Sequence, residues 1–128
     1  MSYQLGSKSI RRMQGVNPDL VRVVERAIEL TEIDFTVLEG LRTRERQEAL
    51  VKAGASKTLR SRHLTGHAVD LAALVVGRVV WNTGPYFKIE RAIKTAAGEL
   101  GIAIEWGGDW KSFRDYVHWQ LPHDKYPA

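Results

Sequence analysis

The absence of cysteine constrains the fold of this chain more than any other single feature. Disulfide bonds, thiolate nucleophiles and cysteine-rich structural zinc sites are all excluded, so a hydrophobic core must hold the fold together. The chain has 128 residues, of which 44% are hydrophobic, and we expect a single domain over residues 1–128. Any metal ion must be bound by histidine and carboxylate side chains, the usual ligands of catalytic rather than structural zinc.

The overall charge is basic, with 19 lysines and arginines against 15 aspartates and glutamates. This balance favours a polyanionic partner without distinguishing nucleic acid, acidic lipid and an anionic cell-wall polymer, and an ordinary domain with a basic surface explains it equally well. Because no run of five or more lysines and arginines occurs, we expect no nucleic-acid partner. No apolar secretory signal or bilayer-spanning stretch is found. We therefore expect no stable membrane association, and a protein that stays in the cytoplasm unless released.

Hydrophobic periodicity predicts an α+β fold, with two or three helices packed against a small, mainly antiparallel sheet. Asn17 and Pro18 form a typical helix start, as N-cap and first helical residue. Gly77 separates two strand-like segments and suggests a hairpin. The expected helices cover residues 17–31, 43–53 and 85–100, and the expected strands cover 33–38, 68–76, 78–81, 102–105 and 116–121. Residues 55–66 are expected to be irregular, and residues 106–108 to end the fourth strand.

Three histidines, His63, His67 and His118, are candidate metal ligands, whereas His123 in the polar tail is expected to be solvated. His63 and His67 are four residues apart and would share one face of a helix, as in the zinc motif H-E-x-x-H. The position after His63 holds leucine instead of the essential glutamate, and Gly66 disfavours a helix. We therefore reject the helical zinc motif.

Two other patterns are more specific. Ser61–Asp70 (SRHLTGHAVD) fits S-x-H-x-x-G-x-A-x-D at every fixed position, and Asp115–Trp119 (DYVHW) supplies D-x-x-H followed by an aromatic residue. At these points the sequence resembles the D-alanyl-D-alanine-type (VanY/LAS-like) zinc metallopeptidases. That family includes bacterial carboxypeptidases and dipeptidases, and phage endolysins that cut L-alanyl-D-glutamate bonds. The resemblance runs from about Asn17 to Leu121 and implies a hedgehog/D-Ala-D-Ala peptidase-like fold.

The resemblance implies that His63, Asp70 and His118 bind Zn²⁺, with Asp115 as the general base. Two imidazoles and one carboxylate leave a fourth position for water, as at catalytic zinc sites. An alternative for Asp115 is an ion pair with neighbouring Arg114 or another surface cation. His63 and Asp70 are seven residues apart, and Asp115 and His118 are three apart. On a regular strand, an odd separation places two side chains on opposite faces. We therefore expect His63 in a loop, Asp70 on a strand, and Asp115 just before the strand of His118.

A third segment, residues 38–47, resembles the arginine motif of the family, x-x-R-[ST]-x-x-x-Q. Arg42 would stabilise the oxyanion or hold a substrate carboxylate. Gln47 would orient the substrate or Arg42, and Ser61 would bind substrate or cap its loop. His67 is expected to line the cleft or stabilise Asp70, and not to be a fourth ligand.

The function implied by this resemblance is that of an endolysin, cleaving the L-alanyl-D-glutamate bond in peptidoglycan stem peptides during host lysis. Because no long apolar heptad pattern or exposed strand stands out in the sequence, we expect a monomer. Such an enzyme would wait in the host cytoplasm and reach the periplasm and cell wall after a holin opens the membrane. A D-Ala-D-Ala carboxypeptidase or dipeptidase is the alternative within the fold. A non-catalytic zinc-stabilised binding module is the alternative from another class. Aspartate at position 115, rather than the glutamate of many dipeptidases, favours the endolysin.

Overall fold

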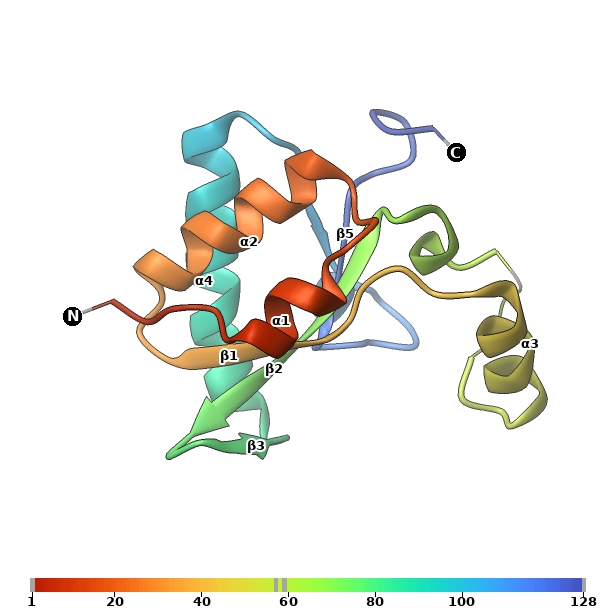
Figure 1. The fold of residues 1–128 in the computed structure, drawn as a ribbon, viewed down its shortest axis with the longest axis horizontal. Helices are drawn as coiled ribbons and strands as arrows, with labels where there is room; N and C mark the ends of the chain where they lie inside the picture. Colours follow the sequence, from red (N-terminus) through yellow and green to blue (C-terminus); the bar gives the residue numbers. More distant parts are fainter. Residues whose placement is uncertain (1, 57, 59, 128) are drawn as a thin grey trace.

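The computed structural model describes residues 2–56, 58 and 60–127, and the fold is α+β with an open antiparallel sheet (Figure 1). The elements in chain order are α1 (Ser7–Arg12), α2 (Pro18–Leu30), β1 (Asp34–Glu39), α3 (Arg44–Lys52), the 3-10 turn η1 (Arg62–Thr65), β2 (Ala68–Val75), β3 (Arg78–Val80), α4 (Thr83–Leu100), β4 (Glu105–Trp106), the 3-10 turn η2 (Gly107–Asp109) and β5 (His118–Gln120). This arrangement confirms the predicted fold class.

Strand β2 is the centre of the sheet. The strand order is β1-β2-β5-β4, and β3 also pairs with β2. Strands β3 and β5 divide one edge of β2 between them, because β3 pairs with residues 73–75 and β5 with residues 68–70. The half of β2 next to η1 therefore pairs with β5, and the functional side chains gather there.

The hydrophobic core lies between the sheet and the helices α2 and α4, which pack against each other (Figure 1). Helix α2 begins as predicted, since the Asn17 side chain accepts a hydrogen bond from the Asp19 amide and Pro18 is the first helical residue. Successive strand residues point to opposite faces. In β2, Val69 and Leu71 belong to the core cluster, so Asp70 points away from the helices.

Helix α1 and strand β4 depart most clearly from the predicted elements. Helix α1 was not expected, because its sequence SKSIRR has no apolar stripe and its buried residue is Ser9. Ser9 instead donates to or accepts from Thr36 and accepts from the Val37 amide, which ties α1 to β1 by polar contacts. Strand β4 begins at Glu105 rather than at residue 102 and includes Trp106, which stacks on Trp119 of β5.

The remaining helices and strands lie within a few residues of their predicted positions. Helix α3 begins after Thr43, whose side chain accepts from the Arg46 amide, and Gly77 lies between β2 and β3 as predicted. In the described part of the chain, no helix is both long enough and apolar enough to cross a membrane.

Candidate metal centre

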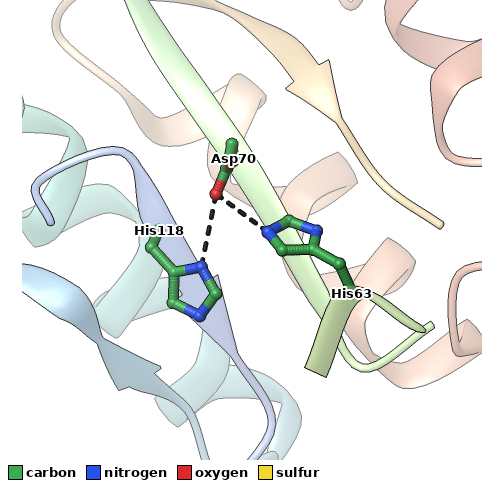
Figure 2. Close-up of side chains that lie close together, drawn as sticks. All are labelled: His63, Asp70 and His118. Atoms are coloured by element: carbon green, nitrogen blue, oxygen red, sulfur yellow. Dashed lines mark hydrogen bonds and ion pairs between the residues drawn. The ribbon is translucent and has the colours of Figure 1, made fainter. Parts of the chain in front are cut away.

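Three side chains from separate elements converge on one point: His63 from η1, Asp70 from β2 and His118 from β5 (Figure 2). One potential ligand atom from each residue lies within 4.8 Å of those of the other two. His63 is 2% exposed, and His118 is also buried. The sequence motifs therefore predicted a cluster that the fold brings together across 55 residues of chain.

The register of the sheet explains how Asp70 and His118 meet. These two residues are directly opposite each other in the antiparallel pair β2–β5. Their neighbours Val69 and Trp119 are also paired and belong to the core cluster. Because side chains alternate between faces, the apolar neighbours point to the helices while Asp70 and His118 share the opposite face.

His63 reaches this face from η1, a single 3-10 turn, where the sequence predicted an irregular loop. The Ser61 side chain caps the turn by accepting from the His63 amide at 3.2 Å. Gly66 ends it in the left-handed conformation with φ of 76°, which glycine adopts without the steric cost of a side chain. The turn directs the chain back into β2, as predicted for this glycine.

The hydrogen bonds around the cluster show why it fits a metal ion. Asp70 Oδ1 lies 3.1 Å from His63 Nε2 and 3.3 Å from His118 Nδ1. The outer nitrogens face acceptors, since His63 Nδ1 lies 2.8 Å from the Gly40 carbonyl oxygen and His118 Nε2 lies 2.7 Å from Gln120 Oε1. When both rings are neutral and donate outward, they present lone pairs to the Asp70 carboxylate oxygen, and a cation between the three side chains would satisfy them. Two imidazoles and a carboxylate are a donor set that fits zinc.

The pKa values of the metal-free cluster follow from the same contacts. Burial alone would raise the pKa of Asp70, but hydrogen bonds from His118 and His63 outweigh it and hold this pKa well below its usual range. Burial also acts to lower the pKa of His118, yet the hydrogen bond to Asp70 and its negative charge raise it overall.

Asp115 lies in the turn just before β5, as predicted, and lines the same cleft as His118. Its amide donates to the Gly107 carbonyl at 3.1 Å, and its own carbonyl accepts from the His118 amide at 3.2 Å. A Cβ atom at position 107 would overlap the Asp115 carbonyl oxygen, so glycine permits this close approach. Burial and the neighbouring Asp70 raise the pKa of the Asp115 carboxyl, which suits a group that must take up a proton.

Arg42 lies beside the metal cluster, and its donors point to protein acceptors. Its Nε and Nη2 donate to the two carboxylate oxygens of Glu39 at 2.6 and 2.9 Å, and its Nη1 donates to Gln47 Oε1 at 2.7 Å. Nη2 also lies 3.8 Å from Asp70 Oδ2, and Nη1 lies 3.5 Å from Ser61 Oγ. Gln47 is fully buried, and the residues predicted for substrate binding thus form one connected network.

The two remaining histidines lie outside this cluster. His67 Nδ1 lies 2.7 Å from the Thr65 hydroxyl, and its ring faces Tyr126 of the C-terminal segment. His123 is exposed, as predicted. Sequence reasoning missed Glu39 and Gln120, although Gln120 follows His118 by two residues on a strand and so had to share its face.

The cluster opens into a cleft of about 690 Å³, a volume within the usual range for ligand sites. Residues from α3, from the segment before η1 and from the segment before β5 line it, and its arginines include Arg42, Arg60 and Arg114. The Nε of Arg114 donates to the Trp110 carbonyl, and no ion pair of Arg114 with Asp115 is found among the described residues. The cleft therefore combines the three clustered side chains and Asp115 with several arginines.

Comparison with known proteins decides the family. The family model described as phage L-alanyl-D-glutamate peptidase matches residues 1–120. The chain belongs to this peptidase family. One relative in the family, the L-alanyl-D-glutamate peptidase of Escherichia phage T5, is 34% identical over 91% of this chain and 88% of its own length. A second, the L-alanyl-D-glutamate peptidase of Listeria phage A118, is 36% identical over 73% of this chain but only 32% of its own length.

Solved structures agree with the membership of this chain in the phage L-alanyl-D-glutamate peptidase family. The L-Ala D-Glu endopeptidase ChiX of Serratia marcescens has a TM-score of 0.92 and 49% identity, covering 95% of this chain and 92% of that one. The vancomycin-resistance D,D-dipeptidase VanXYg has a TM-score of 0.54 and 20% identity, covering 86% of this chain and 53% of that one. The latter likeness concerns the fold, which is that of the D-Ala-D-Ala peptidases.

Proposed function

We propose that this chain is a zinc-dependent endopeptidase that cleaves the L-alanyl-D-glutamate bond in peptidoglycan stem peptides. The observation that carries the proposal is the convergence of His63, Asp70 and His118 in the cleft that Asp115 also lines. A binding module would need the ligands but not a carboxylate with a raised pKa beside them. The names of the relatives support the choice of bond.

In this proposal His63 Nε2, His118 Nδ1 and Asp70 hold the zinc ion. When bound, zinc would polarise the scissile carbonyl group and make a water molecule acidic enough to attack near neutral pH. Asp115 accepts the proton of the attacking water and passes it to the departing amino group of D-glutamate. The burial that raises the pKa of Asp115 strengthens it as a base for this transfer.

The arginines of the cleft give a reason for selecting an acidic substrate. A D-glutamyl residue has two carboxyl groups, and a linear peptide continues through only one of them, so one negative charge remains beside the scissile bond. Arg60 and Arg114 line the cleft and are exposed, and we assign them the attraction of this charge. Arg42, held by Glu39 and Gln47, acts on the substrate through the Nη groups that face Ser61 and Asp70.

The proposal extends to the biological setting. The enzyme acts as a monomer with one catalytic domain over residues 1–128, and its positive charge of +4 favours retention on the anionic cell wall. It accumulates in the host cytoplasm and reaches the periplasm and the cell wall when a holin opens the membrane. Host lysis is the outcome, as expected of a phage endolysin.

Removal and return of the metal test the zinc requirement. Chelation of the purified protein should abolish solubilisation of cell walls, and one equivalent of Zn²⁺ per chain should restore it. The variant Asp115→Ala should bind zinc normally and remain inactive, which separates catalysis from mere metal binding. Full activity after complete metal removal, or undiminished lysis by Asp115→Ala, would contradict the proposal.

A further inference from the structure

We infer that Gln120 is a positioning residue that keeps the hydrogen of the His118 ring on Nε2, and that Glu105 orients the Gln120 amide for this task. The inference rests on the proposed zinc site, because its consequence is that His118 Nδ1 faces the metal with a lone pair. Neither residue belongs to the motifs that identify the family, and neither is a metal ligand.

We call this chain of contacts the relay. The sheet places its four polar side chains, those of Asp70, His118, Gln120 and Glu105, on one face. Asp70 pairs with His118 across β2 and β5, and Gln120 pairs with Glu105 across β5 and β4. His118 and Gln120 are two residues apart on β5 and therefore point to the same side. The intervening Trp119 pairs with Trp106 and lies in the core on the other side. The register thus forms a row from the cluster to the edge of the sheet.

In each hydrogen bond of this row, one group is the donor and the other the acceptor. The Glu105 carboxylate only accepts, and Gln120 Nε2 donates to its Oε2 at 3.3 Å. With the amide nitrogen turned to Glu105, Gln120 Oε1 faces His118 Nε2 at 2.7 Å and accepts its hydrogen. A neutral imidazole with hydrogen on Nε2 has its lone pair on Nδ1, the nitrogen that lies 3.3 Å from Asp70 Oδ1.

The other orientation of the Gln120 amide would favour the other tautomer of His118. If Gln120 turned its NH₂ group to His118, the hydrogen of the ring would move to Nδ1 and block the nitrogen that faces Asp70. Glu105 disfavours that orientation, because it would then face the carbonyl oxygen of Gln120. His63 needs no such relay, since the backbone carbonyl of Gly40 fixes its hydrogen on Nδ1 at 2.8 Å.

Three variants test the relay through zinc affinity, measured by competition with a chromophoric chelator. Gln120→Leu removes the acceptor at nearly constant volume and should weaken zinc binding by roughly 10- to 100-fold, the usual cost of losing such a partner. Glu105→Gln frees the amide to turn and should weaken binding by a smaller factor. The double variant Glu105→Gln with Gln120→Glu exchanges the two side chains. The carboxylate at position 120 then accepts from His118 and the amide at position 105 donates to that carboxylate, so the zinc affinity should return to that of the unaltered chain.

Nuclear magnetic resonance of the zinc-loaded, unaltered chain tests the same relay without any substitution. Long-range ¹H–¹⁵N spectra should show hydrogen on Nε2 of His118 and on Nδ1 of His63. In Gln120→Leu the His118 signals should change while those of His63 do not, which makes His63 the internal control. Thermal unfolding of the metal-free variants separates lost affinity from lost folding.

The outcomes distinguish the relay from the zinc site. Unchanged zinc affinity in a folded Gln120→Leu variant, or hydrogen on Nδ1 of His118 in the zinc-loaded chain, would overturn the relay and leave the zinc site intact. Failure of the unaltered chain to bind zinc would overturn the site itself, and the relay with it.

Discussion

Gly107 holds the turn that carries Asp115, and its replacement by alanine is a sharp test of that role. A Cβ atom at position 107 would overlap the Asp115 carbonyl oxygen and lie 3.1 Å from Asp115 Cβ. Gly107 is not among the residues with positive φ, so the backbone itself accepts alanine and only space opposes it. The substitution therefore moves the turn without changing any group that reacts.

The expected magnitude follows from the overlap. The Cβ atom would lie 2.3 Å from the Asp115 carbonyl oxygen, whereas real Cβ atoms essentially never come within 3.0 Å of such a neighbour, so relief of the overlap requires the turn to move by roughly 1 Å. Misplacement of a reacting group by about 1 Å costs on the order of 100-fold in rate, or about 2.7 kcal/mol in the activation free energy. Overpacking should also reduce the free energy of unfolding by about 1–3 kcal/mol.

The assay compares kcat on soluble muropeptides and zinc affinity for Gly107→Ala and a matched control, Gly98→Ala. Gly98 is an exposed residue of α4, and a Cβ atom there meets nothing within 4 Å. The control should keep full activity and gain about 0.5–1 kcal/mol of stability, because alanine suits a helix better than glycine. Gly107→Ala should lose activity while binding zinc within a fewfold of the unaltered affinity. Normal kcat in Gly107→Ala would refute the argument, and so would loss of zinc in place of loss of rate.

Three further predictions concern the cluster itself. Asp115→Asn should lower kcat by roughly 10²–10⁴-fold, because asparagine cannot act as the base. The same variant should stabilise the metal-free chain, because burial makes the ionised carboxylate unfavourable. Kinetics and thermal unfolding measure these two effects, and a destabilised variant would contradict the reasoning. His63→Ala should abolish stoichiometric zinc binding and the stabilisation that zinc confers, both read by calorimetry, whereas His123→Ala should change neither. The metal-free chain should be most stable within a limited pH range. The pKa of Asp70 is lowered by folding, so this residue stabilises the fold above the ordinary aspartate pKa, and the stabilisation is lost as the pH falls through the pKa of folded Asp70. The pKa of His118 is raised by folding, so this residue stabilises the fold below the ordinary histidine pKa, and the stabilisation is lost as the pH rises through the pKa of folded His118. Unfolding across pH should therefore show a maximum between about pH 4 and pH 6.5, and the alkaline decline should disappear in His118→Ala.

Local sequence patterns predicted the features that depend on neighbouring residues, such as where a helix begins and which residues lie on a strand. Pro18 and the side chain of Asn17 begin α2 because they satisfy its first amides. The odd separation of His63 and Asp70 predicted that Asp70 would lie on a strand and His63 outside it, and Asp70 lies on β2. The motif resemblance supplied the ligand set, and the converging side chains in the structure agree with it.

Other features depend on register between segments distant in the sequence, which no local pattern encodes. Asp70 and His118 meet because β2 and β5 pair with these two residues opposite each other. The pairing of Arg42 with Glu39 is local, since the two residues are three apart, and it was missed because Glu39 is not a fixed position of the arginine motif. Gln120 was missed because its role appears only when Glu105 of β4 lies beside it.

The bond that is cleaved tests the central claim most directly. Purified peptidoglycan should be digested with the zinc-loaded chain, and the soluble fragments should be identified by mass spectrometry. The proposed function predicts glycan-linked L-alanine with a free carboxyl group, together with peptides that begin at D-glutamate, and neither product after chelation. Release of free D-alanine, with the L-alanyl-D-glutamate bond intact, would contradict it.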